Sequence, residues 1–324
     1  MDVAASTGGA LSILQQYYDN ALEDSDNNWL FIVSTPHFNE ASNVKVIKFP
    51  WVKRNWFYRI FFELFTARVA IRDFSPDVIY NLQNIITLGV TRNQVVYLHQ
   101  AIPFSTYKMK LFNEPLLWFY QNIYSHFIFY SLRRASQIIV QTEFMKDSCL
   151  ELLHIPEEKI LVVPPKFNYT KPREINRNAL EDKSIFFYPA GGPSFKNHKV
   201  ILDALLLMTD EQLKKIQVVF TLVGDESKII RRINKVVQQK KLPVVFVGYL
   251  DKEKMEDYYS KSVLVFPSVI ETFGLPLLEA KQYGSIIFAS DSPFSHEILD
   301  GYDKVEFFNP FSPSELYKLL ASFL

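Results

Sequence analysis

The chain has 324 residues, 48% of them apolar, and its 35 basic and 35 acidic side chains give a formal net charge of zero. This length suits two domains better than a single core. The balanced charge argues against a broad basic surface for nucleic acid. The one cysteine, Cys149, excludes an internal disulfide framework and any multi-cysteine metal site, and it favours a reducing compartment.

The N-terminus and the hydropathy pattern show no targeting signal. The opening MDVAASTGG has no basic segment followed by an apolar run, as a secretory signal would. No window of about 18 residues is continuously apolar, so no bilayer-spanning helix is predicted. We therefore expect a cytoplasmic protein.

The first half of the chain alternates short apolar segments with helical patterns. The longest helical pattern runs from about residue 109 to 134, and a polar, proline-containing stretch then precedes the second half. We expect an N-terminal domain at 1–165, a linker at 166–183 and a C-terminal domain at 184–324. Strands are predicted at 2–6, 29–34, 44–49, 77–81, 94–100, 136–141 and 159–164.

The second half repeats the alternation more regularly. Helices are expected from about residue 197, up to about 240, from 251, and around Glu279. Short β-branched strands separated by helices indicate parallel sheets covered on both faces, so the fold class is α/β with two doubly wound, Rossmann-like domains. Strands are predicted at 184–190, 217–225, 243–250, 262–268, 285–290 and 304–308.

Residues that directly follow the strands are the candidates for a ligand site, because open parallel sheets bind ligands beyond their carboxyl ends. Gly8 and Gly9 follow the first predicted strand and leave room for a ligand to approach the backbone. His99 ends another strand, although a lone histidine is more often structural. A simple tight turn would also explain the paired glycines, so neither signal is specific.

Two strand-to-helix turns in the second half have the composition of anion sites. In YPAGGPSFKNHK, Gly192 frees the backbone and Lys196 lies just ahead of a predicted helix start. A lysine and free amides at a helix N-terminus suit a phosphate, although the spacing is not that of a Walker loop. Gly224 lies in a similar turn, LVGDES.

The stretch FPSVIETFGLPLLEAKQYGS carries two acids, Glu271 and Glu279. Pro276 suits a first helical turn and Gly284 a helix end, so Glu271 is predicted in a loop and Glu279 about one turn inside a helix. A loop acid can accept hydrogen bonds from sugar hydroxyls, and an acid inside the helix can hold a ribose diol. Two solvated acids would show the same spacing, so the residues alone leave both interpretations open.

The aromatic residues of the first half gather in two segments, at about residues 49–74 and 107–136. Both mix Trp, Phe and Tyr with Lys and Arg at helical spacing. Helices packed on a sheet explain this pattern, and so does a surface that lies on anionic lipid. We expect the protein to contact an anionic membrane surface, at the inner face of the membrane.

The block SVIETFGLPLLEAKQYG, followed by FASDSPFSHEIL, resembles the retaining glycosyltransferases of family 4, and within them enzymes that assemble bacterial capsule or O-antigen saccharides. Glu271 and Glu279 match the Glu-x7-Glu signature of that family. The resemblance continues in Gly8 and Gly9, in His99, in VQTEFMKD, and in the lysine of FKNHK. It covers nearly the whole chain and implies the GT-B architecture, in which two Rossmann-like domains face a central cleft.

The resemblance implies a role for each matching residue. Glu271 would orient the donor sugar, Glu279 would hold the nucleotide ribose, and Lys196 would neutralise the donor diphosphate. His99 would lie beside the sugar, and the backbone at Gly8, Gly9, Gly192 and Gly224 and from Thr272 through Phe273 to Gly274 would assist. The implied reaction moves a hexose from a nucleotide sugar to a lipid-linked saccharide with retention of configuration. It requires no metal and no other cofactor.

Three departures from the family pattern stand out. Many relatives carry an Arg a few residues before the phosphate lysine, where this chain has Pro193. The opening strand is short, and relatives usually continue with further helices at the C-terminus, so we expect a truncated or minimal member. DSD at 24–26 imitates a metal-binding Asp-x-Asp, but it lies in a polar run and is interpreted as a loop.

The sequence is also compatible with two other classes of function. A catalytically silent, glycosyltransferase-like subunit would explain the missing Arg. A nicotinamide-dependent oxidoreductase would also have Rossmann-like halves, but it would need G-x-G-x-x-G after the first strand, where this chain has STGGALSIL.

Overall fold

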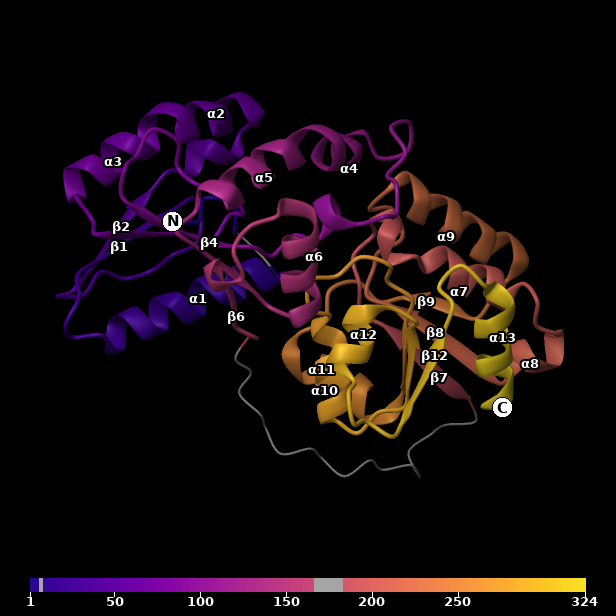
Figure 1. Ribbon diagram of the computed structural model, residues 1–324. Coiled ribbons are helices and arrows are strands. Elements are labelled where there is room, and N and C mark those ends of the chain that lie inside the picture. The colour runs from indigo at the N-terminus through magenta and orange to yellow at the C-terminus, as the bar shows by residue number, and fades with distance from the viewer. Residues whose placement is uncertain (6–7, 166–182) are drawn as a thin grey trace. The chain divides into compact units, whose positions relative to one another are not determined.

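The computed structural model describes residues 1–5, 8–165 and 183–324 (Figure 1). The chain divides into two compact units. The first unit holds residues 1–104 and the described residues from 120 to 165, and the second holds residues 105–119 and 183–324. The linker predicted at 166–183 lies, apart from Lys183, outside the described residues.

The first unit is built on parallel strands, in a two-stranded sheet of order β1-β2 and a four-stranded sheet of order β3-β4-β5-β6. The backbone of Met1 and Asp2 lies between the two sheets. Leu82 N donates to Met1 O (2.9 Å), and Asp2 N donates to Ile32 O (2.9 Å). The strands are β1 (Trp29–Val33), β2 (Val44–Lys48), β3 (Val78–Asn81), β4 (Asn93–Tyr97), β5 (Gln137–Val140) and β6 (Ile160–Val162).

The strand predicted at 2–6 is wrong. Only an isolated parallel bridge between Asp2 and Val33 forms there. The cause is the side chain of Asp2, whose Oδ1 accepts hydrogen bonds from the amides of Ala4 and Ala5, both at 2.8 Å. Such a local bond to the following amides turns the chain out of the strand direction.

Helices cover both sides of the first unit's strands. One apolar cluster joins Leu14 of α1 to Phe31, and another joins Phe62 to Ile32 and Ile79. Figure 1 shows α1 on one side, and α2 and α3 on the other. The helices are α1 (Gly8–Glu23), η1 (Pro50–Lys53), α2 (Trp56–Phe61), η2 (Phe62–Thr66), α3 (Ala67–Phe74), η3 (Ile102–Phe104), η4 (Tyr120–Tyr124), α5 (Ser125–Arg134), α6 (Glu143–Leu153) and η5 (Glu157–Lys159).

The helix predicted from 109 to 134 begins later than expected. Its first part, α4 (Pro115–Phe119), starts at a proline, which fits the first helical position because that amide needs no partner. Residues 110–114 instead form a turn, in which Glu114 N donates to Lys110 O at 3.0 Å. The helix then continues through the π-turn η4 into α5.

The second unit is a six-stranded parallel sheet of order β12-β11-β10-β7-β8-β9. This is the order of the doubly wound nucleotide-binding fold, and its winding reverses between the neighbouring strands β7 and β10. Leu264 of β10 lies in register with Phe187 of β7. The strands are β7 (Ser184–Tyr188), β8 (Ile216–Phe220), β9 (Val244–Phe246), β10 (Val263–Phe266), β11 (Ile287–Ser290) and β12 (Val305–Phe308).

Buried aromatic side chains on the central strands form much of this unit's core. Phe186 and Phe187 of β7 and Phe266 of β10 are fully buried. The helices are α4, η7 (Ser194–Lys196), α7 (His198–Leu205), α8 (Asp210–Lys214), α9 (Lys228–Lys240), α10 (Lys252–Lys261), α11 (Leu275–Gln282), α12 (Pro293–Ile298) and α13 (Pro313–Ser322). Across the described parts of both units, no helix has the length and apolarity needed to cross a membrane.

Candidate active site

The loops after β7 and β10 bring Lys196 and Glu271 together at the crossover of the second unit's sheet. Lys196 Nζ lies 2.5 Å from Glu271 Oε1, and the two side chains are 21% and 14% exposed. Parallel strands end at the same edge of a sheet, so residues that are 75 positions apart in sequence can form one ion pair. The structure thus places two of the predicted catalytic residues in direct contact.

Backbone and side-chain bonds hold the two loops against each other. The hydroxyl of Tyr188 donates to Lys196 O at 2.6 Å, and Val269 N donates to Phe195 O at 2.9 Å. Asn197 has a left-handed φ of 57°, and its Nδ2 donates to Pro267 O and to Pro310 O. One asparagine therefore links the loops after β7, β10 and β12.

Glu279 lies where the sequence predicts, on the fifth residue of α11. The helix begins after Gly274, whose φ of 89° suits glycine, and Pro276 lies in the first turn. The hydroxyl of Tyr259, on α10, donates to Glu279 Oε2 at 2.6 Å. Burial raises the pKa of Glu279, while the bond from Tyr259 and the charge of Lys252 oppose that shift.

The sequence patterns did not identify two residues of this region, Tyr259 and His198. The DYYSK stretch does not show that Tyr259 faces Glu279, because that contact depends on how α10 packs on α11. His198 lies two residues after Lys196 in YPAGGPSFKNHK, and its ring lies between those of Tyr188 (centroids 4.7 Å apart) and Phe220 (5.0 Å). Burial, and secondarily the charge of Lys196, lower the pKa of His198 to about 3, so the ring is neutral.

The predicted glycines of the second unit serve close packing. A Cβ on Gly192 would lie 3.0 Å from Ile230 Cγ1, and Gly192 O accepts from Ser227 Oγ at 3.0 Å. Gly224 has a φ of 101°, and its amide donates to the Glu226 carboxylate at 3.1 Å. A ligand that used the Gly224 amide would have to displace Glu226. Phe273 is buried, whereas Thr272 is half-buried.

The three site residues predicted in the first unit, Gly8, Gly9 and His99, lie in two separate segments of that unit. Gly8 and Gly9 open α1, with Gly8 at a φ of 65° and free space where its Cβ would lie. His99 follows β4, and its backbone amide donates to Asn84 Oδ1 at 2.9 Å. Burial lowers the pKa of His99, with Asp2 opposing, and its Nδ1 has no hydrogen-bond partner among the described residues. The contacts of Gly8, Gly9 and His99 with a donor remain predictions.

The first unit also contains an ionic network that the sequence did not reveal. Arg59 and Glu63 pair at 2.9 Å, and Gln83 Nε2 donates to Glu63 Oε1 at 2.9 Å. The same nitrogen of the Arg59 guanidinium, Nη2, also donates to Gln83 Oε1 at 2.8 Å, which closes the triangle. Burial raises the pKa of Glu63, and Arg59 is the main opposing charge.

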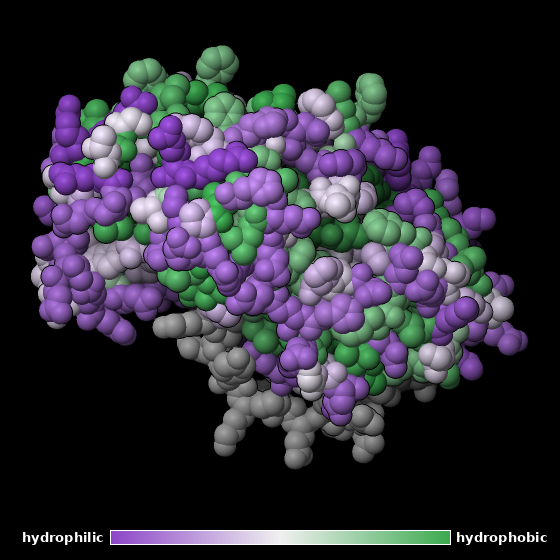
Figure 2. Space-filling view, viewed as in Figure 1, coloured by the Kyte–Doolittle hydropathy of each residue, from purple (hydrophilic) through white to green (hydrophobic). Residues whose placement is uncertain are grey.

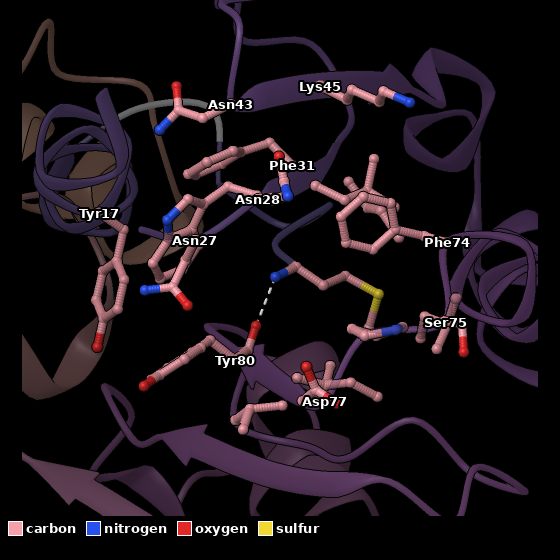
Figure 3. Close-up of a pocket in the computed structure, with 18 of the residues that line it drawn as sticks. Tyr17, Asn27, Asn28, Phe31, Asn43, Lys45, Phe74, Ser75, Asp77 and Tyr80 are labelled. Carbon is pink, nitrogen blue, oxygen red and sulfur yellow. Dashed lines mark hydrogen bonds between the residues drawn. The ribbon is translucent and has the colours of Figure 1, made fainter. Parts of the chain in front are cut away.

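A cavity of about 850 Å³ in the first unit lies away from every predicted site residue (Figure 3). Its walls come from the amino-terminal parts of β1 and β3, with Asn28, Phe31 and Tyr80 among the residues that line it. Met1 also lines it, and its amine donates to Tyr80 O at 2.5 Å. None of the residues predicted to bind a donor contributes to its walls.

The acidic DSD run lies in a loop that is held by hydrogen bonds of its own side chains. The carboxylate of Asp24 accepts from Trp29 Nε1 (2.9 Å) and from Asn27 Nδ2 (3.0 Å). This confirms the interpretation of that run as a loop. Within the described residues, no group of three or more His, Cys, Asp or Glu side chains is arranged to hold a metal ion.

Comparison with known sequences decides the family. Residues 27–168 match the profile described as Glycosyltransferase Family 4, and residues 170–324 match the profile described as Glycosyl transferases group 1. The chain belongs to the family 4 glycosyltransferases. The two matches are separated by one residue and together cover almost the whole chain.

Among curated relatives of this glycosyltransferase chain, the O-antigen chain mannosyltransferase RfbU of Salmonella typhimurium is 26% identical over 228 residues. That match covers 66% of this chain and 56% of RfbU. The serotype-specific mannosyltransferase WbdA of Escherichia coli is 22% identical, over 78% of this chain and 33% of WbdA. The chain therefore spans about half of the first relative and a third of the second.

Solved glycosyltransferase structures confirm the GT-B fold. Sucrose-phosphate synthase of Thermosynechococcus elongatus superposes with a TM-score of 0.76 at 16% identity, over 100% of this chain and 86% of that one. WaaG, a glycosyltransferase involved in lipopolysaccharide biosynthesis, gives 0.72 at 13% identity, over 99% and 88%. Anabaena HepE, solved in complex with UDP-glucose, gives 0.66 at 15% identity, over 99% and 87%.

Proposed function

We propose that the chain transfers a hexose from a nucleotide sugar to a saccharide acceptor in the synthesis of a surface polysaccharide, with retention of anomeric configuration. The observation that carries this proposal is the Lys196–Glu271 pair at the crossover of the second unit's sheet. Ligands of such sheets bind at this crossover. The names of RfbU and WbdA support mannose as the sugar.

The ion pair supplies a way to admit the donor. A diphosphate gives Lys196 a stronger anionic partner, and Glu271 is then free to accept hydrogen bonds from sugar hydroxyls. Glu279 accepts from the ribose diol and is kept in orientation by Tyr259. A carboxylate of raised pKa can hold this contact only when it is deprotonated, so donor binding weakens on acidification.

In the proposed transfer, the bond between the anomeric carbon and the diphosphate oxygen breaks. The acceptor oxygen forms its bond to the same face of that carbon, and the departing phosphate takes the acceptor proton. The protein stabilises charge on the leaving group and positions both substrates, so no strong protein base is required. Lys196 supplies the positive charge, and we therefore propose that activity needs no metal and survives EDTA.

The test is a binding and turnover screen. Wild type and Glu279→Ala would be heated with GDP-mannose, UDP-glucose, a dTDP-sugar and NADPH, and sugar-nucleotide hydrolysis would be followed without acceptor. We expect one sugar nucleotide to raise the melting temperature of wild type alone, and the product anomer, read by NMR, to match the donor. Failure to bind or hydrolyse any sugar nucleotide contradicts the proposal, and stabilisation by NADPH favours the oxidoreductase.

A lipid-linked acceptor at an anionic membrane is the second part of the proposal. One helical stripe from α2 to α3 exposes Phe57, Phe61, Phe65 and Val69, and Phe57 is 86% exposed. Hydrophobic side chains project at the edge of the molecule over α2 in Figure 2. Lys53 and Arg54 are exposed just ahead of the stripe, which suits anionic headgroups.

Flotation with vesicles of phosphatidylglycerol and phosphatidylethanolamine tests this surface. We expect wild type to float at low salt, and the Phe57→Ser/Phe61→Ser double variant to stay at the bottom with an unchanged melting temperature. A matched Leu206→Ser/Leu207→Ser variant, which removes two exposed leucines of the second unit, should still float. If wild type stays at the bottom, the stripe has another function.

A further inference from the structure

A short segment from the first half of the sequence folds as part of the second unit. Residues 105–119 belong to the same compact unit as residues 183–324. Met109 is 4% exposed, and Ser194 Oγ lies 3.8 Å from its sulfur. Tyr107 is stacked on Phe311, with ring centroids 6.3 Å apart and an angle of 9°. We call residues 105–119 the strap.

The strap holds the loop that carries Lys196. Oε1 of Glu114 accepts a hydrogen bond from the backbone amide of Ser194 at 2.8 Å. Ser194 begins η7, and Lys196 is the third residue of this single turn. The other end of the turn is held by Tyr188, whose hydroxyl donates to Lys196 O at 2.6 Å.

The position of Glu114 in the sequence supports a specific role for its side chain. Glu114 directly precedes Pro115, the first residue of α4, where a short Ser, Thr or Asp side chain would bond the helix's own amides. The longer glutamate instead reaches an amide 80 residues away in sequence. A carboxylate that accepts from an amide makes a stronger bond than a neutral acceptor would.

We propose that Glu114 is a positioning residue for Lys196. Its carboxylate holds the first amide of η7, and the hydroxyl of Tyr188 holds the last carbonyl. The backbone of the turn is therefore held in one conformation, which fixes the position from which the Lys196 side chain extends. Glu114 acts through the backbone, because its bond is to Ser194 and the ammonium of Lys196 is bonded to Glu271. The catalytic consequence rests on the function proposed above, whereas the structural consequence does not.

Hydrogen–deuterium exchange tests the structural part without any substrate. In Glu114→Ala, peptides that cover residues 190–197 should exchange several-fold faster than in wild type, while the β8 and β12 peptides stay unchanged. Glu114→Gln keeps an oxygen acceptor and should restore most of the protection. Glu40→Ala is the matched control, because it removes a carboxylate that accepts from the backbone amide of Val46 in the first unit. Unchanged exchange at 190–197 in Glu114→Ala overturns the proposal.

A kinetic double-mutant cycle tests the link to Lys196. Loss of a hydrogen bond to a charged group corresponds to a fall of about tenfold in kcat/KM, and we expect this fall in Glu114→Ala, mainly in kcat. In the Lys196→Ala background, Glu114→Ala should have almost no further effect. Additive effects overturn the positioning role. If wild type has no activity, the proposed function fails, and the exchange experiment still decides whether Glu114 orders the turn.

Discussion

The two units treat their charged side chains in opposite ways. In the second unit, Lys196 and Glu271 meet at the ends of two strands and pair with each other at 2.5 Å, and we propose that a ligand separates them. In the first unit, Arg59, Glu63 and Gln83 satisfy one another in a closed triangle. A pair that a ligand can open suits binding, whereas a closed triangle holds packed helices and loops in one arrangement. We therefore expect the pair of the second unit to act on a ligand and the triangle of the first unit to stabilise the structure.

The largest effect should come from Lys196. Lys196→Met removes the charge proposed to neutralise the leaving diphosphate, and we expect kcat to fall by about 10²–10³, as for loss of an oxyanion donor. Lys199→Met is the control, since Lys199 is exposed and pairs with Asp203 on the same helix. Turnover of the donor identified in the screen would be measured for both. Equal losses of kcat in the two variants would contradict a specific role for the charge of Lys196.

Breaking the triangle of the first unit should reduce stability rather than turnover per folded molecule. Arg59→Met leaves Glu63 without its main opposing charge in a buried position. Because removal of one partner from a buried pair is strongly destabilising, we expect a loss of about 3 kcal/mol in the free energy of unfolding. Urea unfolding would measure it, with Arg72→Met, at an exposed arginine, as the control. A loss no larger than that of the control would show that the triangle contributes little.

Acid should reduce stability through His198, the buried histidine near Lys196. The pKa of His198 is about 3 in the fold and near its ordinary value of 6.5 in the unfolded chain. The unfolded state therefore binds more protons between these values, and this contribution to stability is lost as pH falls from about 6.5 toward 3, by up to about 1.4 kcal/mol per pH unit. His198→Phe should flatten that part of the melting-temperature profile. An unchanged slope would mean that other groups cause the acid sensitivity.

The smallest effect is expected for Glu279→Gln, which should raise the melting temperature and lower the affinity for the donor. Burial raises its pKa, so the folded state disfavours the charged form, and the cost appears as pH rises above the unfolded value. Glu279→Gln keeps an oxygen for Tyr259, and we expect its melting temperature to be about 2 °C above wild type at pH 8 and equal at pH 4. Donor affinity should fall in the same protein. A lower melting temperature at pH 8 would contradict this account.

The sequence was most informative where a local pattern determines the structure. The buried strands of the second half, the start of α7 after Asn197, and the place of Glu279 in α11 all follow from periodicity and from helix-start residues. Lys196 and Glu271 were each placed at a strand end, which brings them to one edge of the sheet. Their direct pairing could not be predicted, because it depends on the side-chain conformations of two loops.

Other features depend on contacts that no local pattern encodes. Tyr259 reaches Glu279 only because α10 packs beside α11, and the Arg59 triangle needs Gln83 from a loop after β3. The failed strand at 2–6 has a different cause, since Asp2 bonds to the amides of Ala4 and Ala5 in competition with the sheet. The assignment of residues 105–119 to the second unit could not be read from the sequence, where they lie between elements of the first unit, η3 and η4.

The strap also limits how this chain can be recombined with its relatives. A hybrid joined only between residues 165 and 183 would combine one parent's strap with the other parent's lysine loop, so Glu114 would face a foreign Ser194 amide and Met109 a foreign surface. The unit of exchange is therefore discontinuous: residues 105–119 have to travel with residues 183–324. A hybrid in which both pieces come from one parent keeps the Glu114–Ser194 bond and the Met109 contact intact.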